Sequence, residues 1–494
     1  MITTRKGAAR LRILILSVCV TSLCAFFFVY RNGDIPLFER FSLVTSTRPE
    51  INNSTESPGS PYLEDETPLP TQTVSPIPVT PVDAGPKDYR EWNTRTLKEL
   101  HSCIKHDNCG SNQRKIALLA SHWFTWGVFN NWRGGEGVWG VSVFKSLDTL
   151  GYTILFAETF EEAVEQHREF PDLVKVVIRH LAGQCHSNPN CVKSPSNPLG
   201  IPAWKIFDLE FFPVFAEHDD GSLLGGKWIL SANPDHLLSE EDSTVQYIGY
   251  SIQDECRQTS PVPLSSRWNQ AWLLMKQIKY VYDNRFAWDR SFFSRASHEL
   301  NIKLVGAWSL DQHYGAWDPE KDGEMKDIED RDRGVYNLGE NLNATSFMHQ
   351  VGMSKVMIGV GNPYWSPSPY NALCQGVPFI NPIIYWDENQ PQRKSAWITQ
   401  HPSLNQFDPP YVYNVHARNW TGFVEAIKAA STTEIASFIP EHMTETAVQA
   451  RLKKLMEENW RSKAAKLLEQ RLQEKKEGKD VYVSPLSSRQ RCPV

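Results

Sequence analysis

The sequence lacks a surplus of basic residues: its 51 Lys and Arg face 57 Asp and Glu, which gives a net charge of -6 over 494 residues. A general nucleic-acid-binding protein is therefore not expected, because such proteins carry a positive surface for the phosphate backbone. Its nine cysteines include no Cys-x-x-Cys pair, which makes structural zinc a weak alternative. Two close pairs, Cys103 with Cys109 and Cys185 with Cys191, instead predict small disulfide rings formed in an oxidising compartment.

Long apolar runs are also scarce. One stretch, 13–30, is long enough to cross a thin bilayer, and basic residues precede it in 1–12. This pattern predicts a cytoplasmic tail (1–12) and a transmembrane signal anchor (13–30) of a single-pass type II membrane protein with a luminal main part. A cleaved signal peptide is the alternative, but Phe26 to Tyr30 offers no small-x-small cleavage site. Residues 31–88, rich in Pro, Ser and Thr, predict an extended stem.

Two further residue types bear on a luminal location. Asn-x-Ser/Thr triplets, which predict N-glycosylation, occur at four positions: Asn52, Asn53, Asn343 and Asn419. Three cysteines have no nearby partner in the sequence. Cys374, on an apolar helix face, is predicted to be a buried thiol, and Cys256 and Cys492 are left unassigned.

Strands and helices alternate from residue 89 onward, which predicts two Rossmann-like α/β domains, 89–266 and 267–440. An apolar strand, Lys115 to Ser121, opens the first sheet, and a Gln/Ser/Pro-rich linker from about residue 251 closes the first domain.

The second domain is predicted to open with a helix, 268–277, followed by a strand, 278–282. Apolar residues at helical spacing in 441–494 predict a C-terminal helical tail that packs back across both domains. A coiled-coil interaction tail is the alternative.

The stretch from Val356 to Gly376 has the pattern of an anion-binding site. An apolar strand, 356–360, runs into Gly361, and a helix follows from about Pro369. Glycine lets a ligand approach the backbone, and a helix N-terminus offers N–H groups and a positive dipole end to a pyrophosphate. A nucleotide-sugar is the ligand that this pattern favours, and a tight turn within an α/β core is the alternative.

The same residues, Ile358-Gly-Val-Gly-Asn-Pro-Tyr-Trp-Ser-Pro-Ser-Pro-Tyr-Asn-Ala-Leu-Cys-Gln-Gly, resemble the donor-site segment of the N-acetylglucosaminyltransferase V family, glycosyltransferase family 18. The flanking segments Phe379 to Pro382, Gln400 to Pro402 and Tyr411 to Val415 follow in the family's order. The resemblance covers most of the C-terminal half well and the N-terminal half thinly.

The resemblance implies a GT-B fold, in which two Rossmann-like domains face a cleft. It also implies an inverting, metal-independent enzyme that transfers GlcNAc from UDP-GlcNAc to the 6-hydroxyl of an α-mannoside on an N-glycan or glycoprotein. No cofactor besides the nucleotide-sugar is expected. A membrane anchor, a stem and a luminal catalytic part also match the layout of Golgi membrane glycosyltransferases.

Glu136 is the predicted catalytic base. It stands in a glycine-rich loop at the mouth of the first sheet, and the resemblance places it on the family's base, fifteen residues before Gly151. The glycines are expected to leave room for an acceptor sugar. Further acceptor-binding residues are predicted by resemblance: Gly134, Gly135, Asp208 and Lys227. A strand-capping role is the alternative for Asp208. The predicted donor-binding residues are Gly359, Gly361, Tyr364, Ser366, Ser368, Asn371 and Lys394.

The chain departs from the family at four positions: Trp365-Ser366 replaces Glu-Gly, Asn371 replaces a helix Glu that holds the ribose, and Gly225 replaces a Trp. These differences leave open another donor or acceptor, or a catalytically inactive carbohydrate-binding homologue. The triplet Asp330-Arg-Asp332 is of the Asp-x-Asp type, but it lies in an acidic loop rather than at a strand end, which disfavours a metal site.

Overall fold

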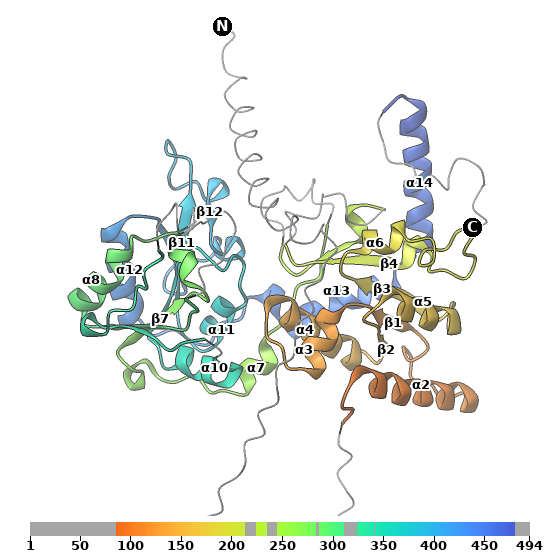
Figure 1. The fold of residues 1–494 in the computed structure, drawn as a ribbon, viewed down its shortest axis with the longest axis horizontal. Helices are drawn as coiled ribbons and strands as arrows, with labels where there is room; N and C mark the ends of the chain where they lie inside the picture. Colours follow the sequence, from red (N-terminus) through yellow and green to blue (C-terminus); the bar gives the residue numbers. More distant parts are fainter. Residues whose placement is uncertain are drawn as a thin grey trace, which may run out of the picture. The chain divides into compact units, whose positions relative to one another are not determined.

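The computed structural model describes residues 85–212, 224–234, 245–282, 286–310, 324–340 and 342–479 (Figure 1). Apart from Gly85, these residues fall in one unit, Pro86–Gln312 with Asp318–Val494. The predicted anchor, most of the stem, Asn52, Asn53 and Cys492 lie outside the described residues. Among the residues described, no helix has both the length and the hydrophobicity needed to cross a membrane.

The first sheet contains six parallel strands in the order β2-β1-β3-β4-β5-β6. Its inner strands are buried along almost their whole length, because helices cover a parallel sheet on both faces. The strands are β1 (Ile116–Leu119), β2 (Thr153–Phe156), β3 (Val174–Arg179), β4 (Ile206–Glu210), β5 (Ile229–Ser231) and β6 (Gln246–Tyr247). The order reverses between β1 and β3, and open α/β sheets bind ligands at the carboxyl ends of strands at such a point.

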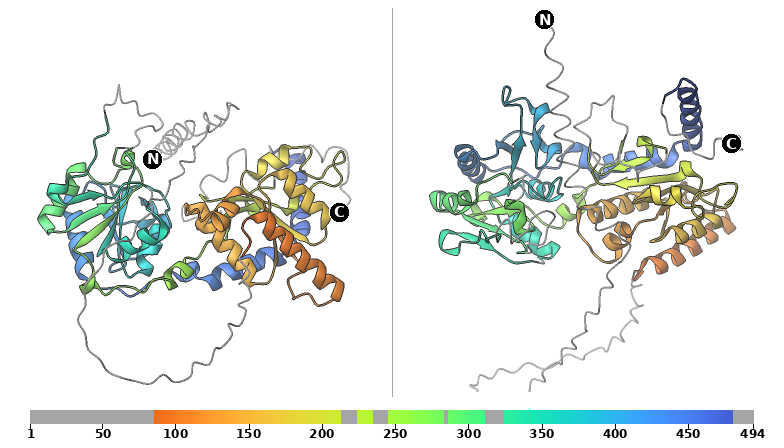
Figure 2. Two further views of the ribbon diagram at one scale, coloured as in Figure 1. Left: turned by 60° about the horizontal axis from the view of Figure 1, so that its bottom comes forward. Right: turned by 45° about the horizontal axis from the view of Figure 1, so that its top comes forward.

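Several helices of this half begin at a residue whose side chain caps the first turn. These caps are Asp88 for α2, Ser121 for α3 and Thr159 for α5. The helices and 3-10 turns are α2 (Tyr89–His106), α3 (His122–Phe129), α4 (Gly135–Thr149), α5 (Phe160–Glu169), α6 (Ala182–Ser187), η1 (Ala203–Lys205), η3 (Gly226–Trp228), α7 (Gln253–Arg257) and η4 (Leu264–Ser266). Figure 2 shows both sheets with their helices from two further sides.

In the second sheet, parallel strands follow the order β9-β8-β7-β10-β11, β13 lies parallel to β11, and β12 pairs antiparallel with the end of β11. The strands are β7 (Gln270–Leu274), β8 (Lys303–Gly306), β9 (Val335–Asn337), β10 (Val356–Gly359), β11 (Phe379–Tyr385), β12 (Ile398–Thr399) and β13 (Val412–His416). Without β12 this is the doubly wound order 3-2-1-4-5-6, and its reversal lies between β7 and β10.

The helical elements of this half are η5 (Ile278–Val281), α8 (Arg290–Leu300), η6 (Arg331–Arg333), α10 (Ala344–Gly352), α11 (Ser368–Cys374), η7 (Lys394–Ala396), η8 (Pro402–Leu404) and α12 (Trp420–Thr432). The predicted start of the domain was wrong: residues 270–274 form a strand rather than a helix, and 278–281 form a 3-10 turn rather than a strand. The run Ala271-Trp-Leu-Leu-Met275 is apolar on both faces, and periodicity alone does not separate a buried strand of this kind from a helix.

The C-terminal helices return to the first sheet. They are η9 (Glu441–Met443), α13 (Glu445–Glu457) and α14 (Trp460–Lys476). Helix α13 packs against α4. Trp460 packs edge-on against Phe207 and Trp228, with ring centroids 4.9 and 5.4 Å away. The C-terminal helices therefore pack against the half that contains the first sheet.

Three disulfides join described residues. Cys103–Cys109 and Cys185–Cys191 confirm the two predicted rings. The prediction that Cys374 is a free buried thiol was wrong, because it bonds to Cys256 and so ties α11 to α7. A separation of 118 residues hides such a pair from sequence inspection.

Candidate active site

Glu136 lies in the first turn of α4, which begins at Gly135. The sequence had placed it in a glycine-rich loop. At this position its carboxylate is close to the positive end of the helix dipole. The side chain is partly exposed, so it is available to a ligand.

The glycines around Glu136 serve packing rather than open space. A Cβ at Gly134 or Gly137 would collide with the ring of Trp132, and a Cβ at Gly135 would lie 2.8 Å from Cζ of Phe211. Protein side chains thus already occupy the side on which an acceptor sugar was expected. The glycines let Trp132 and Phe211 clamp the helix turn that holds Glu136.

Ionisable side chains gather at the carboxyl ends of the first sheet. His180 follows β3, and its Nδ1 lies 3.2 Å from the carbonyl of Leu209. Burial lowers the pKa of His180, and the negative charge of Glu136 opposes this shift. The pKa of Glu210, the last residue of β4, is raised to about 7, chiefly by burial and also by the charges of Asp208 and Glu136. The charge of Glu136 therefore acts on both His180 and Glu210.

Asp208 is only 5% exposed, and its Oδ1 accepts a hydrogen bond from the backbone N–H of Ala182 at 3.1 Å. Burial raises its pKa to about 6. These contacts favour a structural role over binding of acceptor hydroxyls, although Asp208 holds the start of α6 rather than capping a strand end as the alternative had it.

Lys276 brings the second sheet into this site. It lies two residues after β7, at the reversal of strand order. Its side chain is exposed to solvent, yet desolvation by the surrounding protein lowers its pKa, and the charge of Glu136 raises it. Because the surrounding protein partly desolvates Lys276, its positive charge acts more strongly on an anionic ligand than it would in bulk water. An acid of the first half and a base of the second half thus share one electrostatic environment.

Aromatic contacts join the two halves beside these charges. The ring of Phe212, two residues after Glu210, stacks on Tyr364 at 6.1 Å and on Trp365 at 6.4 Å between centroids. Tyr364 and Trp365 belong to the loop that follows β10, so the carboxyl ends of β4 and β10 meet.

The loop 360–367 lies within the predicted donor segment. Gly361 has φ +116°, a conformation that favours glycine, and its N–H donates to Gln400 Oε1 at 2.9 Å. A Cβ at Gly359 would collide with the same Gln400 side chain. Both glycines are therefore required by the backbone and by Gln400, whether or not a ligand binds.

The serines of this loop are held by neighbouring groups. Ser366 Oγ donates to Ser368 Oγ at 3.1 Å, and the carbonyl of Ser366 lies 3.1 Å from Nε2 of His401. Trp365 is fully buried and donates from Nε1 to Ser403 at 2.7 Å. The loop is thus fixed in shape before any donor arrives.

The side chain of Asn371 contacts a carboxylate from another helix. Its Nδ2 donates to Glu255 Oε2 at 3.2 Å, and Glu255 also lies 3.7 Å from Nε of Arg133. A carboxylate from α7 therefore stands against the position at which the resembling family carries a helix Glu. Cys256–Cys374 holds α7 and α11 together at this point.

Two lysines that were predicted to bind the donor and the acceptor, Lys394 and Lys227, make other contacts. Lys394 Nζ pairs with Asp408 at 2.7 Å, which commits its charge to a surface ion pair. Lys227 is exposed in η3, where its carbonyl accepts from Gln246. Nearby Gly225 has φ +83°, so the Trp expected at this position would be strained.

Asn343 and Asn419 are exposed helix caps. Asn343 Oδ1 accepts from the N–H of Ser346 at 2.8 Å, and Asn419 Oδ1 accepts from Gly422 at 3.0 Å. Nδ2 of each, the atom that carries an N-glycan, makes no hydrogen bond to another described residue. N-glycosylation at both stays a prediction.

Among the described residues no three His, Cys, Asp or Glu side chains are placed to hold a metal ion. Asp330 caps η6 and accepts from the N–H of Arg333 at 3.2 Å.

Sequence reasoning missed Lys276, Glu210, His180 and Glu255. Lys276 was hidden because β7 was predicted to be a helix. Glu210 and His180 carried a usable signal: each is a polar residue at the end of an apolar strand, and Glu210 shares a strand face with Asp208. Glu255 carried none, because its partner Asn371 is 116 residues away.

Residues 331–474 match the model of glycosyltransferase family 18, which confirms the resemblance seen in the sequence. A search of curated proteins found no match. Similar solved structures include a glycosyltransferase of Rickettsia africae (11% identity, 73% of this chain and 99% of that chain, TM-score 0.35). Another is an O-GlcNAc transferase mutant of Thermobaculum terrenum (12% identity, 80% of this chain and 69% of that chain, TM-score 0.33). A third is a UDP-GlcNAc 2-epimerase of Methanocaldococcus jannaschii in complex with UDP-GlcNAc and UDP (9% identity, 69% of this chain and 98% of that chain, TM-score 0.35). At such low scores these likenesses carry no weight for function.

Proposed function

We propose that this chain, whose residues 331–474 match the model of glycosyltransferase family 18, transfers a sugar from a nucleotide-sugar to a hydroxyl of a glycan at the carboxyl ends of its two sheets. The family match supports glycosyl transfer. The assignment of the site rests on one observation: Phe212, just after β4, stacks on Tyr364 and Trp365 of the loop after β10, so the carboxyl ends of the two sheets meet.

Glu136 is the general base in this proposal. It takes the proton of the acceptor hydroxyl as the oxygen attacks the anomeric carbon, and the nucleoside diphosphate leaves from the opposite side. Its place in the first turn of α4 and its partial exposure support this role. Glu210 adds a carboxyl group beside it.

Lys276 stabilises the negative charge that develops on the departing diphosphate. Because the protein partly desolvates Lys276, its charge interacts more strongly with a diphosphate there than in bulk water. A cation in this position supports transfer without a divalent metal ion. The rigid 360–367 loop supplies backbone around the donor, and Glu255 with Asn371 supplies a carboxylate and an amide for the hydroxyls of a ribose.

The donor and acceptor that we propose are UDP-GlcNAc and the 6-hydroxyl of an α-mannoside on an N-glycan, with inversion at the anomeric carbon. The sequence resemblance to the N-acetylglucosaminyltransferase V family supports this choice. We place the protein in the Golgi membrane as a single-pass type II protein with a luminal catalytic part. Three disulfides are consistent with an oxidising lumen.

A thermal-shift screen of the full chain tests the donor. UDP and UDP-GlcNAc are expected to raise the melting temperature, and GDP is not, because a ligand that binds only the native state stabilises it. The shift should survive EDTA. A preference for GDP would replace the donor, loss of the shift with EDTA would contradict metal independence, and no shift with any nucleotide would favour a carbohydrate-binding protein without transferase activity.

A further inference from the structure

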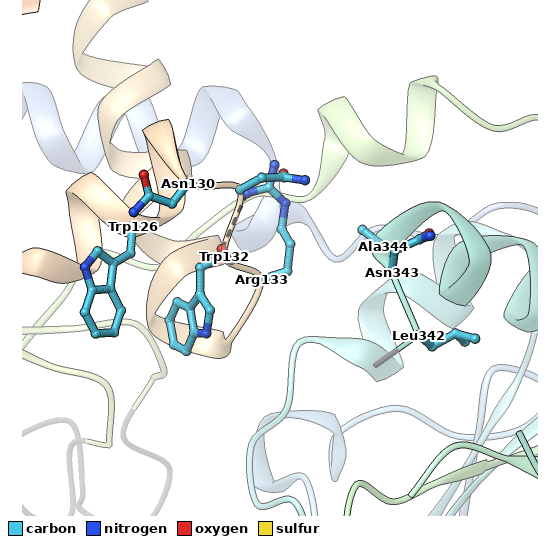
Figure 3. A pocket seen from close by; sticks show the side chains of 8 residues that line it. Trp126, Asn130, Trp132, Arg133, Leu342, Asn343 and Ala344 are labelled. Atoms are coloured by element: carbon cyan, nitrogen blue, oxygen red, sulfur yellow. Dashed lines mark hydrogen bonds between the residues drawn. The ribbon is translucent and has the colours of Figure 1, made fainter. Parts of the chain in front are cut away.

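A pocket of about 450 Å³ lies between the segment joining α3 to α4 and the start of α10 (Figure 3). Trp126 and Trp132 line it on one side, and Leu342, Asn343 and Ala344 line it on the other. Its volume is within the range of small-molecule sites, roughly 300 to 1,000 Å³. None of the residues predicted to bind the acceptor lines it.

The pocket is built around an exposed tryptophan. Trp126 is 41% exposed, which is unusual for so large an apolar side chain. His122, Trp123 and Trp132 surround its ring, with centroids 4.7, 5.6 and 6.2 Å away. Its carbonyl accepts the backbone N–H groups of Asn130 at 3.2 Å and of Trp132 at 3.0 Å. The indole is therefore held in place and still open on one face.

The polar lining suits hydroxyl groups. The side-chain amides of Asn130 and Asn131 are exposed and form no hydrogen bond with any other described residue, so their donors and acceptors are available. Arg133 donates from Nη1 to the carbonyl of Gly127 at 3.0 Å, and Glu255 lies 3.7 Å from its Nε. Because a carboxylate offsets the guanidinium, the pocket has no net charge that would select an acidic ligand.

We infer that this pocket binds a neutral sugar unit of the acceptor oligosaccharide, one that lies beyond the sugar that reacts. The C–H face of a pyranose packs on Trp126, and its hydroxyls hydrogen-bond to Asn130 and Asn131. Trp132 connects the pocket to the chemistry, because its ring fills the space at Gly134 and Gly137, on either side of Glu136. This inference rests on the proposed transferase function and makes Trp126 a residue that determines acceptor choice.

Saturation-transfer NMR of the full chain with α-mannobiose and chitobiose tests the inference. Wild type is expected to bind at least one of them, and Trp126→Ala to bind it roughly tenfold more weakly. Trp126→Phe should recover part of the affinity, which separates stacking from loss of fold. Trp268→Ala removes an equally exposed tryptophan (43%) outside the pocket and should bind as wild type does. Equal binding by wild type and Trp126→Ala, or no binding to wild type, would overturn the inference.

Two further variants separate this inference from its neighbours. In Glu136→Gln, saccharide binding should persist although transfer is lost. If Glu136→Gln keeps transfer activity, Glu136 is not the base, but the pocket can still bind the acceptor. If Glu136→Gln is inactive and Trp126→Ala binds saccharide normally, only the inference about the pocket is refuted. Asn343 lies on the pocket's edge within a glycosylation triplet. Binding seen only in Asn343→Gln would assign the pocket to the protein's own glycan and refute the acceptor subsite.

Discussion

The carboxyl ends of the two sheets differ in how their side chains are committed. On the first sheet, Glu136, His180 and Glu210 are partly exposed, and the charge of Glu136 acts on the other two. On the second sheet, the 360–367 loop is bonded to Gln400 and Ser368, and Lys276 is exposed two residues after β7. The first half thus offers reactive groups, and the second offers a rigid frame with a cation. In the proposed site, the first half removes the proton from the acceptor, and the second half binds the leaving nucleoside diphosphate.

The largest expected effect comes from the reactive side. Glu136→Gln should lower kcat by about 10²- to 10⁴-fold, because it removes the proposed general base and keeps the shape of the side chain. Initial rates with a radiolabelled nucleotide-sugar measure it, alongside circular dichroism as a check on folding. Glu161 is the matched control, since it is the second residue of α5 as Glu136 is of α4. Glu161→Gln should keep wild-type rates, and a similar loss in both variants would contradict a special role for Glu136.

The rigid frame is tested by its long-range disulfide. Replacing both Cys256 and Cys374 by Ser should reduce the free energy of unfolding by about 2–4 kcal/mol, because the bond closes a long loop. It should also weaken nucleotide binding, since the bond lies beside Asn371 and Glu255. Chemical unfolding curves and nucleotide titrations measure the two effects.

The control for that experiment is the Cys103–Cys109 pair, which spans six residues. Its double Ser variant should lose less stability, because a shorter loop restricts the unfolded chain less. It should leave nucleotide binding unchanged. If both double variants change nucleotide binding equally, the Cys256–Cys374 bond has no specific role in holding the nucleotide site.

The cation of the second half gives the next effect. Lys276→Met should weaken UDP binding by roughly ten- to a hundredfold, the cost of a lost charged hydrogen bond. Lys303→Met, at the start of β8 and also exposed, should bind UDP as wild type does. Indistinguishable titrations of the two variants would remove Lys276 from the site.

The smallest effect concerns Glu210 and pH. Burial raises its pKa from 4.5 to about 7, so the folded protein holds a proton that the unfolded chain releases. Stability should therefore fall as pH rises from about 4.5 to about 7. Glu210→Gln removes this dependence and should be more stable than wild type at pH 8, on the order of 1–2 kcal/mol after solvent screening. Unfolding curves at pH 5 and pH 8 decide the point, and a parallel pH dependence in the variant would refute it.

The sequence predicted the parts of this molecule that depend on local pattern. Alternating strands and helices gave two α/β sheets, and the six-residue cysteine spacings gave two disulfides. The strand, glycine and helix around Gly361 were also visible. Each of these signals lies within a short stretch of chain.

Features set by distant contacts were not predictable. Cys256–Cys374 and Glu255–Asn371 join residues more than 100 positions apart. Lys394 was predicted to bind the donor, but it forms an ion pair with Asp408. The run at 271–275 was apolar on every face, so no period distinguished its strand from a helix. That single error also concealed Lys276.

Calorimetric titration of UDP into wild type, Glu136→Gln and Lys276→Met tests most directly whether the two halves form one site. If Glu136 and Lys276 face one site, their opposite charges act on the same bound diphosphate with opposite sign. We predict that Lys276→Met binds UDP more weakly than wild type and that Glu136→Gln binds it as tightly or more tightly. UDP affinity that is the same in all three proteins, or absent from wild type, would contradict the account.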